Sequence, residues 1–180
     1  MLRRSTAVCL SLVSAGLLTG VLAGCSSTVH LAPAEGANDP ACAEVSVRLQ
    51  NVPVIADHER RWTDAQATAA WGDPSVVLLT CGLPEAAPTS TLQCITLEGI
   101  DWLVDDSESP NLRLTTYGRK PAVQLYINSK PDGPDKGVSA NDVIGNKNLA
   151  SAISTIPATG KCTAPDAPAT GAPATGAPSN

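Results

Sequence analysis

The sequence predicts an α+β domain: a small antiparallel four-stranded sheet with two helices on one face and two disulfides. Short apolar or alternating segments between turn residues, typical of strands, occupy the middle of the chain. A segment with helical spacing of apolar residues precedes them, and another follows them. Four cysteines lie in the same region: Cys42, Cys81, Cys94 and Cys162. This order of elements favours helices packed on one face of an antiparallel sheet.

The N-terminus has the pattern of an export signal. Arg3 and Arg4 precede an apolar run that Ser and Gly residues interrupt, so a secretory signal peptide over residues 1–24 is favoured over a permanent membrane helix. Leu-Ala-Gly-Cys at 22–25 resembles the lipobox of bacterial lipoproteins, in which the cysteine carries lipid. We therefore predict lipidation of Cys25 and anchoring at the extracytoplasmic face of the cell membrane. The alternative is an ordinary signal peptide without lipid.

The charge of the chain limits its partners. The net charge is −5, and removal of residues 1–24 would leave 10 basic and 17 acidic residues, a net charge of −7. Nucleic acids and anionic headgroups attract clusters of Lys and Arg, so we expect no nucleic-acid partner and no electrostatic attraction to membranes. Membrane attachment would come from the lipid, because a diacylglycerol supplies the two chains that stable anchoring needs.

A tether and a helix are expected to open the mature chain. Residues 25–39 are small and polar and predict a flexible tether, in which His30 has no partner and receives no role. Asp39 and Pro40 are typical of a helix start and predict a helix over about 40–50. The alternation at 45–49 leaves a strand as the competing interpretation.

The next segments are less uniform. Residues 54–70 are irregular and contain the densest charge cluster of the chain, Asp-His-Glu-Arg-Arg-Trp at 57–62. Alanines at 66–71 predict a short helical turn. The apolar run 76–81 predicts a strand buried on both faces. A second strand is expected at 92–98, and a bulge or bend at Gly99 separates it from 100–104.

The rest of the domain predicts a hairpin and a helix. Alternation predicts strands at 112–117 and 123–128, joined by a short turn. Apolar spacing predicts a helix over 141–156, although Gly145 lowers its helical preference. From residue 163 a five-residue Ala/Pro/Thr/Gly repeat contains no large apolar side chain, so 163–180 is expected to be a disordered tail. A single globular domain would then occupy 40–162.

An ordered set of landmarks resembles the actinobacterial domain of unknown function 3515 family. They are Trp-Gly-Asp-Pro at 71–74, Cys-Gly at 81–82, Cys94, Gly-Ile-Asp-Trp at 99–102, Gly-Arg at 118–119 and Cys162. The resemblance covers about 40–162. It implies a small secreted or lipid-anchored protein and no assigned activity. Residues 43–49 depart from it, because they are more strand-like than the helical segment expected of the family.

The cysteines indicate two disulfides, because an exported protein folds in an oxidising compartment. Free buried thiols are the alternative, and four cysteines allow three pairings. Cys42–Cys81 with Cys94–Cys162 would fasten each helix to the sheet, whereas Cys81–Cys94 would staple a hairpin. We favour the first pairing, partly because the family resemblance suggests it. No Cys-x-x-Cys occurs, which excludes zinc-ribbon and thioredoxin motifs.

Candidate binding residues are few. Trp71 could line a ligand groove or cap the core at a tight turn. Asp101 and Trp102, beside Arg119, could form an anion site or a buried Arg–Asp pair, because a guanidinium recognises carboxylate and phosphate. We favour the structural role in both cases. The trio 57–59 would point to alternate sides of an extended chain, and 105–108 lacks the spacing of a calcium loop. We therefore expect no metal and no cofactor.

Catalytic motifs are scarce. His58 is the only histidine within 40–162, and no Gly-x-Ser-x-Gly, Walker or dinucleotide motif occurs. The sequence favours an exported, lipid-anchored envelope protein that acts as a non-catalytic binding or accessory module for an envelope protein or glycan. The alternative is an unrecognised envelope hydrolase that uses His58 with a nearby carboxylate. An exposed Trp groove would support binding, and a pocket that brings His58 to a nucleophile would support hydrolysis.

Overall fold

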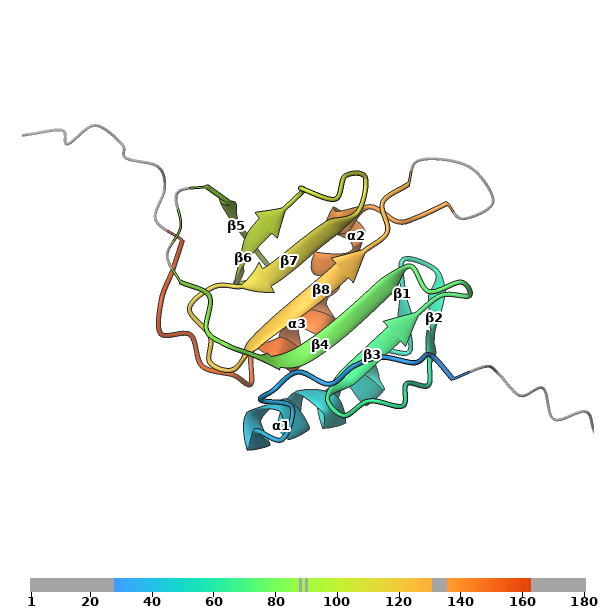
Figure 1. The fold of residues 1–180 in the computed structure, drawn as a ribbon, viewed down its shortest axis with the longest axis horizontal. Coiled ribbons are helices and arrows are strands. Elements are labelled where there is room, and N and C mark those ends of the chain that lie inside the picture. The colour runs from blue at the N-terminus through green and yellow to red at the C-terminus, as the bar shows by residue number, and fades with distance from the viewer. Residues whose placement is uncertain (1–27, 88, 90, 131–135, 163–180) are drawn as a thin grey trace, which may run out of the picture.

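A computed structural model describes residues 28–87, 89, 91–130 and 136–162 (Figure 1). Its main element is an eight-stranded antiparallel sheet in the order β1-β2-β3-β4-β8-β7-β6-β5, so the prediction of four strands is wrong. The strands are β1 Val54–Ile55, β2 His58–Arg61, β3 Thr68–Trp71, β4 Val77–Leu83, β5 Gln93–Leu97, β6 Ile100–Asp105, β7 Leu112–Thr116 and β8 Ala122–Ile127. The helices are α1 Pro40–Arg48, the 3-10 helix η1 Leu49–Asn51, α2 Ala140–Ile144 and α3 Lys147–Ile153.

The sheet contains every strand that the sequence predicted, but one of them is folded in two. The expected hairpin is confirmed, because β7 and β8 pair with Leu114 opposite Leu125. The predicted strand through Gly99 is two strands, because Glu98 and Gly99 both have positive φ (49° and 74°) and form a tight turn. Leu97 therefore faces Ile100 across a β5–β6 hairpin. The expected bulge is a hairpin turn of the kind that two consecutive left-handed residues make.

Strands β1, β2 and β3 were not predicted. The charge cluster 57–62 contains β2, which pairs with β1 across a turn at Ala56 and Asp57, both with positive φ. The predicted helical turn at 66–71 is strand β3, in which Ala69 and Ala70 are both fully buried. The strand is buried on both faces, and the small alanines fit there beside Trp71, which is also fully buried. Packing therefore overrides the helical preference of alanine.

The described residues before α1, 28–39, lie against the domain. Val29 pairs with Thr63, and Gly36 N–H donates to the Gly82 carbonyl at 2.9 Å. The His30 ring contacts the Asp64 carboxylate at 2.6 Å, so the expectation that His30 has no partner is wrong. Residues 28–39 are thus attached to the domain, unlike the tether predicted over 25–39. Residues 1–27 and 163–180, with the predicted signal peptide, lipidation site and tail, lie outside the described residues.

The helices cover one face of the sheet (Figure 1). Helix α1 begins as predicted, because the Asp39 carboxylate accepts a hydrogen bond from Ala41 N–H at 2.8 Å. Its buried side chains and those of α3 pack on the sheet in one core. The predicted helix 141–156 is interrupted after Gly145, where the Asn146 side chain caps α3. A helix that restarts with its own cap satisfies N–H groups that the interruption would leave free.

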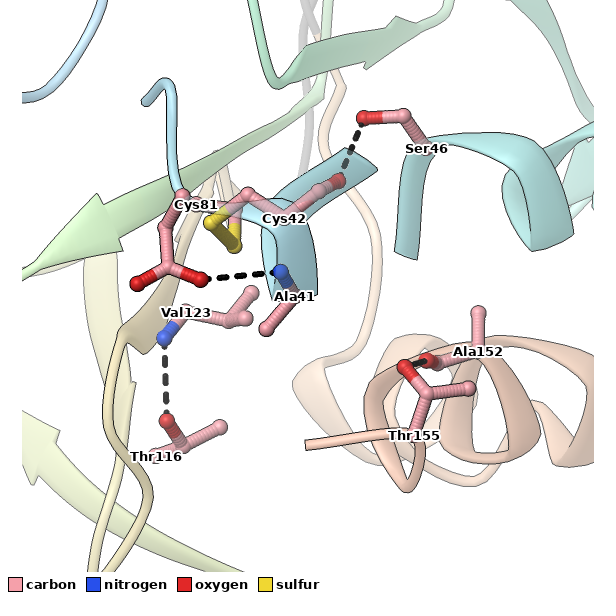
Figure 2. Close-up of a disulfide and its surroundings, with 9 residues drawn as sticks. Ala41, Cys42, Ser46, Cys81, Thr116, Val123, Ala152 and Thr155 are labelled. Carbon is pink, nitrogen blue, oxygen red and sulfur yellow. Dashed lines mark hydrogen bonds between the residues drawn. A yellow bond between two sulfur atoms is a disulfide. The ribbon is translucent and has the colours of Figure 1, made fainter. Parts of the chain in front are cut away.

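Both disulfides have the favoured pairing, which is thereby confirmed. Cys42–Cys81 joins the first turn of α1 to β4, and the Cα atoms are 5.6 Å apart (Figure 2). Cys94–Cys162 joins β5 to the end of the described chain, at 5.7 Å. The first bridge is fully buried, whereas both cysteines of the second are half-buried. Each bridge connects a segment outside the sheet to a strand.

We predict that the double variant Cys42→Ala, Cys81→Ala loses about 4 kcal/mol of unfolding free energy, because the bridge closes a loop of about 40 residues. Urea unfolding of both proteins measures the difference. The control is Val47→Ala on the exposed side of α1, which should change stability by less than about 0.5 kcal/mol. Equal stability of the double variant and the control would show that α1 is held without its covalent link.

Candidate functional site

The tryptophans that the sequence suggested for binding are in the core. Trp71 is fully buried, and its indole N–H donates to the Val52 carbonyl at 3.0 Å. Trp102 is 1% exposed, and its indole N–H has no hydrogen-bond partner among the described residues. A ring without exposed surface cannot stack on a ligand. Neither tryptophan therefore forms part of a surface site.

Asp101 and Arg119 hold the end of the chain instead of forming an open anion site. The buried Arg119 guanidinium donates to the carbonyls of Ile156 and Gly99. Burial lowers the Arg119 pKa, and the nearby Asp101 charge opposes this shift. The Asp101 carboxylate accepts hydrogen bonds from the Thr96 hydroxyl and, at 3.0 Å, from the Cys162 N–H. The expected direct Arg–Asp salt bridge is absent from the described residues.

We predict that Arg119→Lys lowers the unfolding free energy by about 1–3 kcal/mol, because one ammonium cannot reproduce the two-carbonyl fork and leaves a buried acceptor unpaired. Thermal and urea unfolding measure the loss. Arg48→Lys on the exposed surface of α1 is the matched control. A loss no greater than that of the control would contradict the role of Arg119 in holding the chain end.

A groove of about 780 Å³ lies between the β1–β2 hairpin and the α1–η1 segment. Its walls come from consecutive segments of the chain, since all of its lining residues fall within 46–63. The lining residues are Ser46, Gln50, Pro53, Val54, Glu59, Arg60, Arg61, Trp62 and Thr63. This volume is within the range of small-molecule sites.

Trp62 is the most exposed large apolar side chain of the described residues, at 78%. The other exposed large apolar side chains of the described residues are Val47 at 60% and Val54 at 43%, and Val54 also lines the groove. Trp62 follows β2 directly and is held by the backbone, since its carbonyl accepts the Val29 N–H at 2.8 Å. A large amphipathic ring held in water beside a groove is typical of a contact surface.

The two arginines of the groove have different environments. Arg61 is paired, because its guanidinium contacts the Asp73 carboxylate at 2.8 Å and donates to the Gly72 carbonyl. Arg60 lies opposite Trp71 on the helix-covered side of the sheet and makes no side-chain hydrogen bond or salt bridge among the described residues. Partial burial lowers the Arg60 pKa, but a guanidinium remains charged at neutral pH. The groove therefore contains an unpaired, partly desolvated cation.

Two smaller hollows contain polar side chains that pair with one another. One, of about 350 Å³, lies over the second face of the sheet. There Arg113 contacts Glu108 at 2.9 Å and stacks 5.1 Å from the centre of the Tyr126 ring. The other, of about 440 Å³, lies beside Tyr117, where the Thr159 hydroxyl donates to Glu85. Neither hollow has an exposed aromatic ring like that of Trp62.

The histidine of the charge cluster has no hydrogen-bonded partner in the described part of the chain. His58 lies in the β1–β2 hairpin opposite Ile55, lines none of these three hollows and makes no side-chain hydrogen bond within the described residues. No group of three or more His, Cys, Asp or Glu side chains is positioned for a metal in the described part of the chain. Its helices are also too short or too polar to cross a membrane.

The sequence did not point to this groove. Trp62 and Arg60 belong to the cluster at 57–62, which carries four charged residues and was interpreted as irregular. The signal that could have identified it is alternation, because residues 60 and 62 share one side of an extended segment. Charged residues are also common on strands near a sheet edge, where they prevent further pairing.

Comparison with known proteins gives a family and no further relative. Residues 6–156 match the family model described as protein of unknown function (DUF3515). No curated protein and no solved structure matches the chain. The matched region begins within the predicted signal peptide and ends before Cys162, so it differs at both ends from the expected 40–162.

Proposed function

Because the chain belongs to the DUF3515 family of proteins of unknown function, we propose its function from its own residues: an exported, lipid-anchored cell-envelope protein with a non-catalytic binding or accessory role. The observation that carries the binding role is Trp62, exposed beside a groove of about 780 Å³ and next to Arg60, which has no side-chain partner among the described residues. Tryptophan is enriched at interfaces, because its ring is largely apolar and its N–H is polar.

Three features support export and anchoring. The apolar run ending in Leu-Ala-Gly-Cys at 22–25 has the order of a lipoprotein signal. The two disulfides have Cα–Cα distances of 5.6 and 5.7 Å. Disulfides are typical of proteins that fold in an oxidising compartment outside the cytoplasm. The described helices offer no membrane span, so attachment would depend on the lipid.

We predict that Cys25→Ala moves the protein from the membrane to the soluble fraction, or leaves it as an uncleaved precursor, because no other residue would receive the lipid. Fractionation of cells and intact-protein mass spectrometry measure location and acyl mass. Cys9→Ala, within the predicted signal peptide, should change neither. Mature wild-type protein that remains with membranes without added acyl mass would contradict the anchoring proposal.

We also predict that a photoreactive amino acid at position 62 gives a covalent adduct in intact cells, because position 62 would face the partner. The adduct is detected by a mass shift in denaturing gels. The control position is Ser151, exposed on α3. Equal yields at the two positions would contradict a binding role for the groove. The chemical class of the adduct, whether lipid, glycan or protein, identifies the partner.

A further inference from the structure

The position of the N-terminal segment relates the groove to the proposed lipid. Val29 N–H donates to the Trp62 carbonyl at 2.8 Å, and Asp64 N–H donates to the Val29 carbonyl at 3.3 Å. Leu31 N–H adds a bond to the Asp64 carboxylate at 2.9 Å. The chain is therefore fixed to the domain at Trp62 itself.

The remaining distance to the anchor is short. Three residues lie between Cys25 and Val29, so four residue steps connect the two positions. A chain of this length spans at most about 14 Å, whatever its conformation, because a residue advances by no more than about 3.6 Å. The headgroup region of a bilayer is itself several ångströms deep on each side. A lipid on Cys25 would consequently keep Trp62 beside the membrane surface.

The geometry points to the phospholipid surface as the occupant of the groove: Trp62 inserts at the level of the headgroups, and Arg60 contacts a lipid phosphate. This inference rests on the proposed lipid anchor and names the partner of the same groove. Val54 adds apolar surface to the contact.

The chemistry of the groove suits a bilayer interface. Tryptophan concentrates at the membrane–water boundary, where its ring is apolar and its N–H stays hydrated. An arginine places its apolar stem along such a surface and its guanidinium among the phosphates. Arg60 is available for this contact, because it has no acidic partner among the described residues.

The overall charge limits this contact to the groove. The chain from Cys25 onward has 10 basic and 17 acidic residues, a net charge of −7, so the domain as a whole is not attracted to anionic lipid. The anchor supplies the affinity, and the groove determines which side of the domain faces the bilayer. A glycan or a protein is a weaker candidate for this site, because the short connection leaves little space between the groove and the membrane.

The test uses the full lipidated protein in vesicles of phosphatidylcholine and phosphatidylglycerol, with and without bromine on the acyl chains. Bromolipids quench tryptophans that reach the membrane. Trp71 and Trp102 are at most 1% exposed, so quenching reports on Trp62. We expect bromolipids to quench one component of the emission and iodide in the buffer to leave it unquenched. Trp62→Phe should abolish bromolipid quenching, and Arg60→Gln should weaken it, unlike the surface control Arg48→Gln.

Protein that floats with the vesicles while iodide quenches Trp62 and bromolipid does not would overturn the membrane contact and leave the anchor intact. A groove adduct with glycan or protein in cells would then identify the occupant. Protein that carries no acyl mass and stays in the buffer would overturn the anchoring proposal, and the membrane contact with it. Equal quenching of the Arg60→Gln and Arg48→Gln variants would refute the phosphate contact.

Discussion

The arrangement of this domain depends on the buried Cys42–Cys81 bridge. Helix α1 is nine residues long, and an isolated helix of that length is not stable in water. The bridge fixes its first turn to β4, near the middle of the sheet (Figure 2). At the other end of the α1–η1 segment, the Trp71 indole N–H donates a hydrogen bond to the Val52 carbonyl, just after η1. One covalent bond and one buried hydrogen bond thus set the position of the helix over the strands.

The groove follows from this placement. Its two walls are the α1–η1 segment and the β1–β2 hairpin, and the hairpin joins the rest of the sheet by the pairing of β2 with β3. The side chains of Arg60 and Trp62 lie at the groove between them, and neither side chain has a hydrogen-bond or salt-bridge partner among the described residues. The sheet edge at β1 is therefore the functional side of the molecule in our proposal. The described chain begins on this side and ends near β5 on the opposite side (Figure 1).

Most local elements could be predicted from the sequence, and the sheet as a whole could not. The start of α1, the strand at 76–81 and the hairpin of β7 and β8 follow from capping, apolar runs and alternation. Strand β3 was not predicted, because alanine prefers helices. In the structure its two alanines are fully buried in the sheet, and this packing decides the conformation. Strand β2 was not predicted, because its charged residues indicated an irregular segment. The sequence favoured a structural role for Trp71, and its burial agrees, but the exposure of Trp62 depends on contacts distant in sequence.

The two bridges also determine how the domain would respond to tension. A pull between Thr28 and Cys162 passes from Cys42 to Cys81 and from Cys94 to Cys162 through the sulfur atoms, and bypasses both enclosed loops. The sheet strands other than part of β4 and the start of β5 lie within those loops. Only residues 28–42 and 81–94 could lengthen under force. A protein held in the envelope at one end and drawn from the other would therefore extend little, and most of its strands would carry no stretching force along their backbone.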